Sequence, residues 1–149
     1  MKFIYITILS LVGLVSCVNP TTGKVSAVTT AQNAQPYARP GADAIGIGLL
    51  AVAPNPVEKV KRAKWLFAVA TAIRSISSTT PPSVADFQKA LTTITPTNEN
   101  DWLQVVTALS GLYSGFRAQF GNNTNTVLLL IEQIALGLED AADPYVTTT

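Results

Sequence analysis

The side chains in this chain that are best suited to metal or acid-base chemistry are three carboxylates near its end. Glu139, Asp140 and Asp143 are close neighbours in the sequence, and oxygen ligands of this kind suit Ca²⁺. Their spacing lacks the alternating pattern of an EF-hand loop, so we expect a solvated acidic helix end rather than a calcium site. Asp86 and Asp101 are placed as helix-capping residues, which leaves no obvious carboxylate pair for glycoside hydrolysis.

The residue types that most enzymes need are missing from the sequence. It contains no histidine, which excludes Ser-His-Asp and Cys-His catalysis and histidine-ligated zinc. Gly46 and Gly48 lack the further residues of a phosphate-binding loop. The net charge is only +1, and no basic tail is present. We therefore expect a protein that is not an enzyme, with no cofactor, no metal and no nucleic-acid partner.

The single cysteine, Cys17, follows an apolar run at the start of the sequence. Lys2 precedes this run, residues 3–15, in the layout of a secretory signal peptide. As a helix the run would rise only about 20 Å, which is short of the roughly 30 Å hydrocarbon core of a bilayer. We therefore expect a cleaved signal peptide rather than a spanning helix, although an uncleaved anchor or conventional cleavage nearby remain alternatives.

The residues Leu14, Val15, Ser16 and Cys17 resemble the lipobox of bacterial lipoproteins. The resemblance implies cleavage between Ser16 and Cys17, followed by lipidation of the Cys17 thiol and often of the new amino terminus. Two or three acyl chains suffice for stable membrane anchoring. Because Val18 rather than an aspartate follows the cysteine, the resemblance implies the outer membrane wherever the source has two membranes.

Composition suggests one globular domain behind this anchor. The chain has 149 residues, of which 48% are hydrophobic and 13% charged, enough for one core but short for two domains. Residues 18–40 are rich in Thr, Ala, Asn and Pro and predict a flexible tether, with a short helix over 25–35 as the alternative. The predicted organisation is a signal peptide (1–16), a lipidated cysteine with its tether (17–40) and a helical domain (41–149).

Periodicity and capping residues predict an all-α fold in the helical domain. Capping pairs open three segments, namely Asn55 with Glu58, Ser83 with Asp86, and Asn98 with Asp101. The predicted helices cover residues 42–52, 56–77, 84–93, 99–120 and 124–142. Short connections favour a small up-down bundle of about four to five helices. The last helix is apolar on most of its circumference and is expected at the centre, although residues 127–131 alone would also fit a strand.

Two apolar features suggest close packing or contact with lipid. Gly111 and Gly115 form a G-x-x-x-G spacing, which we expect to contact another helix of the bundle rather than to mediate a membrane dimer. Residues 44–53 are apolar but too short to span a bilayer. Burial in the core is the expected outcome for this segment. The alternative is a lipid-facing segment of a membrane-active protein, phage-encoded or toxin-like, that perturbs the bilayer.

Charge is divided between the two halves of the mature sequence. Residues 17–94 carry eight basic and three acidic residues, and residues 95–149 carry one basic and six acidic residues. We expect the two halves to pair internally. The second reading places Lys59, Lys61, Arg62 and Lys64 against anionic lipid headgroups or an acidic partner.

These observations predict a lipid-anchored protein of the cell envelope with a structural or partner-binding role. Its expected partners are the membrane, reached through the lipid on Cys17, and another envelope protein.

Overall fold

The computed structural model describes residues 27–76, 81–94, 100–120 and 123–146, with side chains from residue 37 onward. Within these ranges the chain forms five α-helices and no strand. The helices are α2 (Ala27–Ala51), α3 (Pro56–Ser75), α4 (Val84–Ile94), α5 (Asn100–Phe120) and α6 (Thr124–Val146). The predicted all-α fold is therefore confirmed, and the strand alternative for residues 127–131 is wrong because they lie inside α6.

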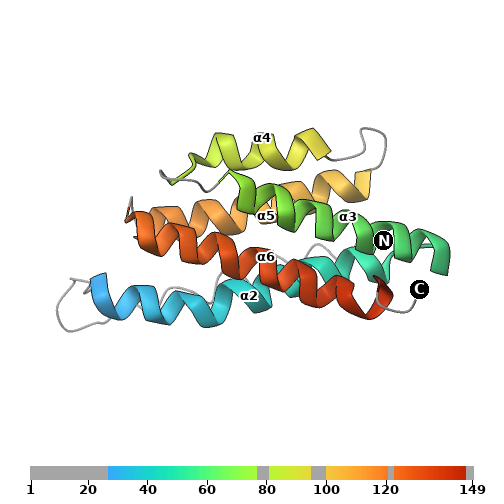
Figure 1. Ribbon diagram of the computed structural model, residues 1–149, viewed down its shortest axis with the longest axis horizontal. Helices are drawn as coiled ribbons and strands as arrows, with labels where there is room; N and C mark the ends of the chain where they lie inside the picture. Colours follow the sequence, from blue (N-terminus) through green and yellow to red (C-terminus); the bar gives the residue numbers. More distant parts are fainter. Residues whose placement is uncertain (1–26, 77–80, 95–99, 121–122, 147–149) are drawn as a thin grey trace.

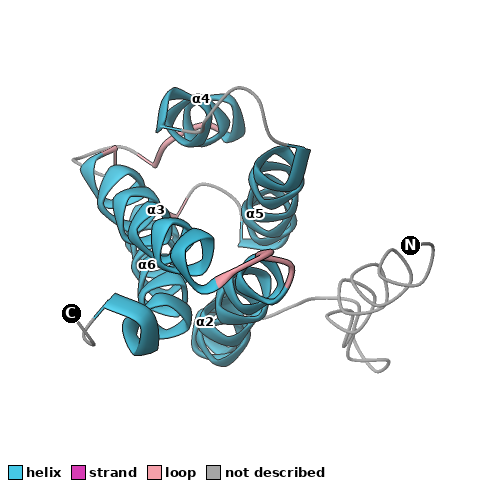
Figure 2. Cartoon of the chain, turned by 90° about the vertical axis from the view of Figure 1, so that its right-hand side faces the viewer, coloured by secondary structure: helices cyan, strands magenta, loops and turns pink. Residues whose placement is uncertain are grey.

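The helices lie roughly parallel to the long axis of the molecule, and the chain reverses direction between successive helices (Figure 1). This arrangement is the predicted up-down bundle. In cross-section α4 lies at one side, bridging α3 and α5, and α2 lies at the opposite side (Figure 2). The chain starts and ends its described part in two helices, α2 and α6, that pack against each other.

The core is centred on α6, as its apolar sequence predicts. This helix contacts α2, α3 and α5, and its buried side chains run from Val127 to Ala142. Aromatic pairs fill the space farther from it. Trp65 meets Trp102 edge to face with the ring centroids 4.3 Å apart, and Phe87 stacks on Tyr113, also at 4.3 Å.

The start of the helical domain differs from the sequence-based prediction. Helix α2 begins at Ala27, so the second part of the predicted tether, residues 27–40, is helical. Ala38 and Ala42 are fully buried, and Arg39 bonds to α6. A proline in a helix interior costs about 3 kcal/mol, and α2 contains both Pro36 and Pro40. Packing of α2 against α6 and α5 offsets that cost.

Close helix packing occurs at different glycines from those predicted. Gly111 and Gly115 are exposed, and a Cβ atom at either position would meet nothing within 4 Å. The prediction that they contact another helix of the bundle is therefore wrong. The close approach is between α2 and α6. A Cβ atom on Gly137 would lie 2.9 Å from the Cβ atom of Ala42, and one on Gly46 would lie 2.6 Å from that of Ala141.

Candidate functional site

Asn55 and Ser83 cap their helices as predicted, whereas the Glu58 carboxylate contacts Lys61 and Arg62 instead of completing the predicted capping box. The Asn55 side chain accepts a hydrogen bond from the Glu58 backbone N–H at 2.8 Å. Ser83 and Asp86 form a reciprocal pair, with the Asp86 N–H donating to Ser83 Oγ at 3.1 Å and the Ser83 N–H donating to Asp86 Oδ2 at 3.3 Å. The bonds from Ser83 hold the pKa of Asp86 below its usual value. Asn98 lies outside the described residues.

Arg62 lies inside the bundle rather than on a contact surface. Only 4% of the residue is exposed. Its Nη1 donates to the Leu49 carbonyl oxygen at 3.0 Å, and its Nη2 donates to Asp101 Oδ2 at 3.0 Å. The guanidinium carbon also lies 5.8 Å from the Trp102 ring centroid. Arg62 therefore connects α3 to the end of α2 and the start of α5, and Asp101 is an ion-pair partner in addition to any capping role.

A surface pocket of about 390 Å³ opens beside this arginine, lined by Pro54, Glu58, Arg62, Asn100 and Asp101. Glu58 Oε1 lies 3.6 Å from the Arg62 Nε. Both carboxylates of the pocket thus face the same guanidinium group. In this pocket the Arg62 guanidinium lies between two carboxylates. Its ion pair with Asp101 links α3 to α5.

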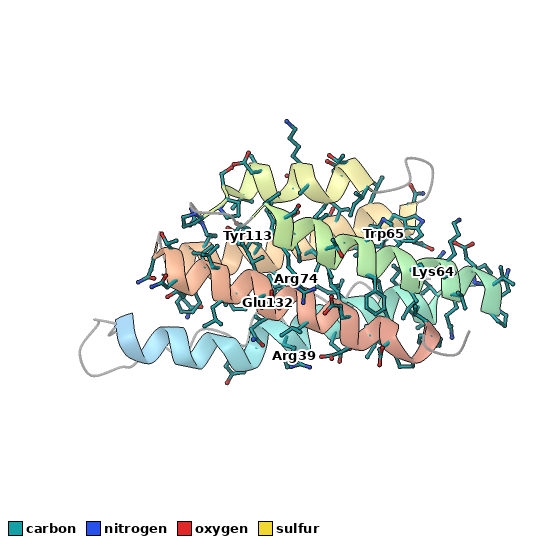
Figure 3. All side chains as sticks on the ribbon, viewed as in Figure 1. Arg39, Lys64, Trp65, Arg74, Tyr113 and Glu132 are labelled. Carbon is teal, nitrogen blue, oxygen red and sulfur yellow. The ribbon has the colours of Figure 1, made fainter. Side chains whose placement is uncertain are left out.

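Two further arginines join α6 to its neighbours. Arg74 of α3 donates to both oxygens of Glu132, at 2.9 and 3.0 Å, and also to both oxygens of Glu139. Figure 3 shows Arg74 and Glu132 side by side between the two helices. These bonds raise the pKa of Arg74. Arg39 of α2 donates from Nε and Nη2 to Asp140, at 2.5 and 2.9 Å.

The expected internal pairing of the two charge halves is confirmed by these contacts. Arg39, Arg62 and Arg74 each bond to a carboxylate from the second half of the chain. The acidic end of α6 was expected to be solvated, whereas Glu139 and Asp140 form ion pairs there. The divided charge was the only signal for these contacts, since neither Arg74 nor Glu132 stands in a recognisable motif.

The remaining members of the predicted basic surface have different environments. Lys59 Nζ lies 5.3 Å from the Tyr145 ring centroid. Lys61 Nζ is 3.4 Å from Glu58 Oε1, and its side chain is largely exposed. Lys64 is exposed on the same helix (Figure 3). Of the four basic residues, Lys64 and Lys61 are exposed, with Lys61 paired to Glu58, whereas Arg62 is buried.

The apolar segment 44–53 divides between the core and the surface. Leu49 and Leu50 are buried, as expected. Ile47 is 53% exposed and Val52 is 45% exposed. The segment therefore has a buried side and an exposed side, because residues 44–51 form the last turns of α2 at the edge of the bundle.

The sites predicted at Ser16 and Cys17 lie outside the described residues. Within the described part, no helix is both long and apolar enough to cross a membrane. The same part contains no group of three or more His, Cys, Asp or Glu side chains that could hold a metal ion. Compared with models of protein families, with curated proteins and with solved structures, the chain matches none significantly.

Proposed function

We propose that this chain is a lipid-anchored protein of the cell envelope that acts by contact rather than by catalysis. The observation that carries the proposal is the sequence Leu14-Val15-Ser16-Cys17 at the end of the apolar run 3–15. The lipid on Cys17 would hold the helical bundle at the membrane surface. A default location in the outer membrane, where the source has one, follows from Val18.

The ion pairs of the bundle support a role other than catalysis. Glu132 and Glu139 bond to Arg74, Asp140 bonds to Arg39, and Asp101 bonds to Arg62. Each of these carboxylates therefore has oxygen atoms already bonded to an arginine of a neighbouring helix. These groups stabilise contacts between helices. The protein would therefore act through the surface of its helical bundle.

The contact could involve another envelope protein or the headgroups of the membrane. Lys64 on α3 offers exposed positive charge for either. Anchoring is preferred over perturbation of the bilayer through residues 44–53 because Leu49 and Leu50 belong to the core of the bundle. Insertion of that segment would require both side chains to leave the core.

Labelled palmitate tests the proposal in cells that express the full chain. The label should enter the wild-type protein and the matched Ser16→Ala variant, which keeps a small residue before the cysteine. It should not enter Cys17→Ser, and this variant should leave the membrane fraction. Palmitate incorporation that is equal in wild type and Cys17→Ser would refute anchoring at Cys17.

A further inference from the structure

Helix α2 has an exposed side without a charged residue, which we call the outer face of α2. Tyr37 is 59% exposed and Ile47 is 53% exposed, and the positions between and after them on this side are small or apolar. The outer face consists of Tyr37, Pro40, Ala44, Ile47, Gly48 and Ala51. Their spacing of three or four residues follows the helical period, so they form one continuous strip.

The two charged residues of α2 lie off this strip and near Asp140 of α6, and Arg39 and Asp140 are themselves exposed. Arg39 bonds to Asp140. Burial raises the pKa of Asp43, and the charge of the nearby Asp140 carboxylate raises it further. The neighbouring helix α5 exposes mainly uncharged residues, and its two charged residues, Asp101 and Arg117, are partly buried. By contrast, α3 and α4 expose Lys61, Lys64, Asp86 and Lys89.

The position of α2 in the chain brings this strip close to the proposed anchor. Only residues 18–26 separate Cys17 from Ala27, and nine residues span at most about 30 Å. The 25 residues of α2 extend for about 37 Å. Lipid on Cys17 would therefore hold the first turn of α2 near the headgroups, from where the helix can lie along the surface.

We infer that the outer face of α2 lies against the lipid surface in which Cys17 is anchored. This inference rests on the proposed function. A bilayer accepts uncharged and apolar side chains at its interface and penalises charged ones. Tyr37 has the apolar ring and polar tip that suit an interfacial position. In this orientation α4, on the opposite side of the bundle (Figure 2), points away from the membrane and toward a partner.

Cysteine labelling can test this orientation because Cys17 is the only cysteine of the chain and lipid would occupy its thiol. Ile47→Cys and the control Gln88→Cys, on the exposed side of α4, would each carry a nitroxide. The lipidated protein would be reconstituted in phosphatidylcholine vesicles with and without phosphatidylglycerol. Accessibility to a water-soluble nickel complex and to oxygen, which concentrates in lipid, is then measured, together with palmitate incorporation.

The label at position 47 should lose several-fold accessibility to nickel and gain accessibility to oxygen in both types of vesicle, while the label at 88 stays fully accessible to nickel. Equal nickel accessibility at both positions in a palmitoylated protein would overturn the inference alone. Shielding at 47 with spin coupling between copies would also overturn it, because a second copy would then cover the strip. A protein without palmitate would overturn both this inference and the proposed function.

Discussion

Arg62 satisfies polar groups on two neighbouring helices through one buried guanidinium. The Leu49 carbonyl that it reaches belongs to the last turn of α2, where backbone acceptors lack partners within the helix. The Asp101 carboxylate that it pairs with lies in the first turn of α5, where the helix dipole favours negative charge. One side chain thus stabilises the end of one helix and the start of another.

Arg62 belongs to the same basic cluster as Lys61 and Lys64. Its replacement should nevertheless lower the free energy of unfolding substantially, because its side chain is buried. Arg62→Leu should lower the free energy of unfolding by about 2 kcal/mol, because it leaves the Leu49 carbonyl without its donor. The matched variant Lys64→Leu should change it by less than about 0.5 kcal/mol, since Lys64 is exposed. Urea denaturation measures both values, and equal effects would contradict a buried structural role for Arg62.

The pair between Arg39 and Asp140 predicts a dependence of stability on pH. The hydrogen bond from Arg39 lowers the pKa of Asp140 below its unfolded value of about 3.9. The pair therefore stabilises the fold above this pH, and its contribution is lost as the pH falls through the lower, folded value. Asp43 acts in the opposite sense, because its pKa is raised.

Asp140→Asn should be less stable than the wild type at pH 6 and should lose less stability between pH 5 and pH 2. Arg39→Gln should flatten the same region, because it removes the other partner. Urea midpoints at several pH values provide the comparison. Midpoints that fall in parallel for the wild type and both variants would show that this pair contributes nothing to the acid response.

At the scale of elements, the contact between α2 and α6 depends on small residues. Gly137 faces the backbone of α2 near Arg39 and Asp43, so an added methyl group would force the helices apart. Gly137→Ala should therefore destabilise the fold by about 1–3 kcal/mol. Gly111→Ala is the matched control, because its methyl group would enter open space and raise helix propensity by up to about 1 kcal/mol. If both substitutions changed the free energy of unfolding in the same direction, the result would contradict the observed packing.

Amide hydrogen exchange can test whether the start of α2 belongs to the folded unit. The amides of Tyr37, Ala38 and Arg39 should be protected to a degree similar to that of Leu49, because all four residues lie inside one helix that packs on the core. A flexible tether over these residues would exchange at the rate of an unfolded chain. Fast exchange at residues 37–39 with slow exchange at Leu49 would restore the shorter helix that the sequence predicts.

Local signals in the sequence were sufficient where each helix is defined by its own residues. Asn55 and Ser83 marked the starts of α3 and α4, and the apolar residues of α6 marked the centre of the bundle. The local signals failed where contacts with another helix decide the structure. Pro40 is tolerated in α2 because of packing that residues 36–40 do not encode. Gly137 has no motif, yet it makes the closest contact, whereas the recognisable pair Gly111 and Gly115 makes none.

The candidate site was less predictable than the fold for the same reason. The sequence showed that the two halves of the chain differ in charge, but not which residues would pair. Arg62 appeared equivalent to Lys61 and Lys64, since periodicity places all of them on early turns of one helix. Only the position of α5 beside α3 distinguishes the arginine, because it brings Asp101 and Trp102 to the guanidinium.

At the scale of the whole molecule, the charged side chains and the proposed anchor have separate roles. Ion pairs hold α6 to α2 and α3, and the exposed lysines of the described helices lie on α3 and α4. The outer face of α2 is uncharged and belongs to the helix that follows Cys17 most closely. A bundle attached at this end would present its charged helices to the space beyond the membrane.

The most direct test of this account is the mass of the amino-terminal peptide of the mature protein, isolated from the membranes of its source. We predict a peptide that begins at Cys17 and carries a diacylglyceryl group on the thiol, with or without a further acyl chain on the amino group. A mature protein that begins elsewhere, or a Cys17 that carries an unmodified thiol, would contradict the account.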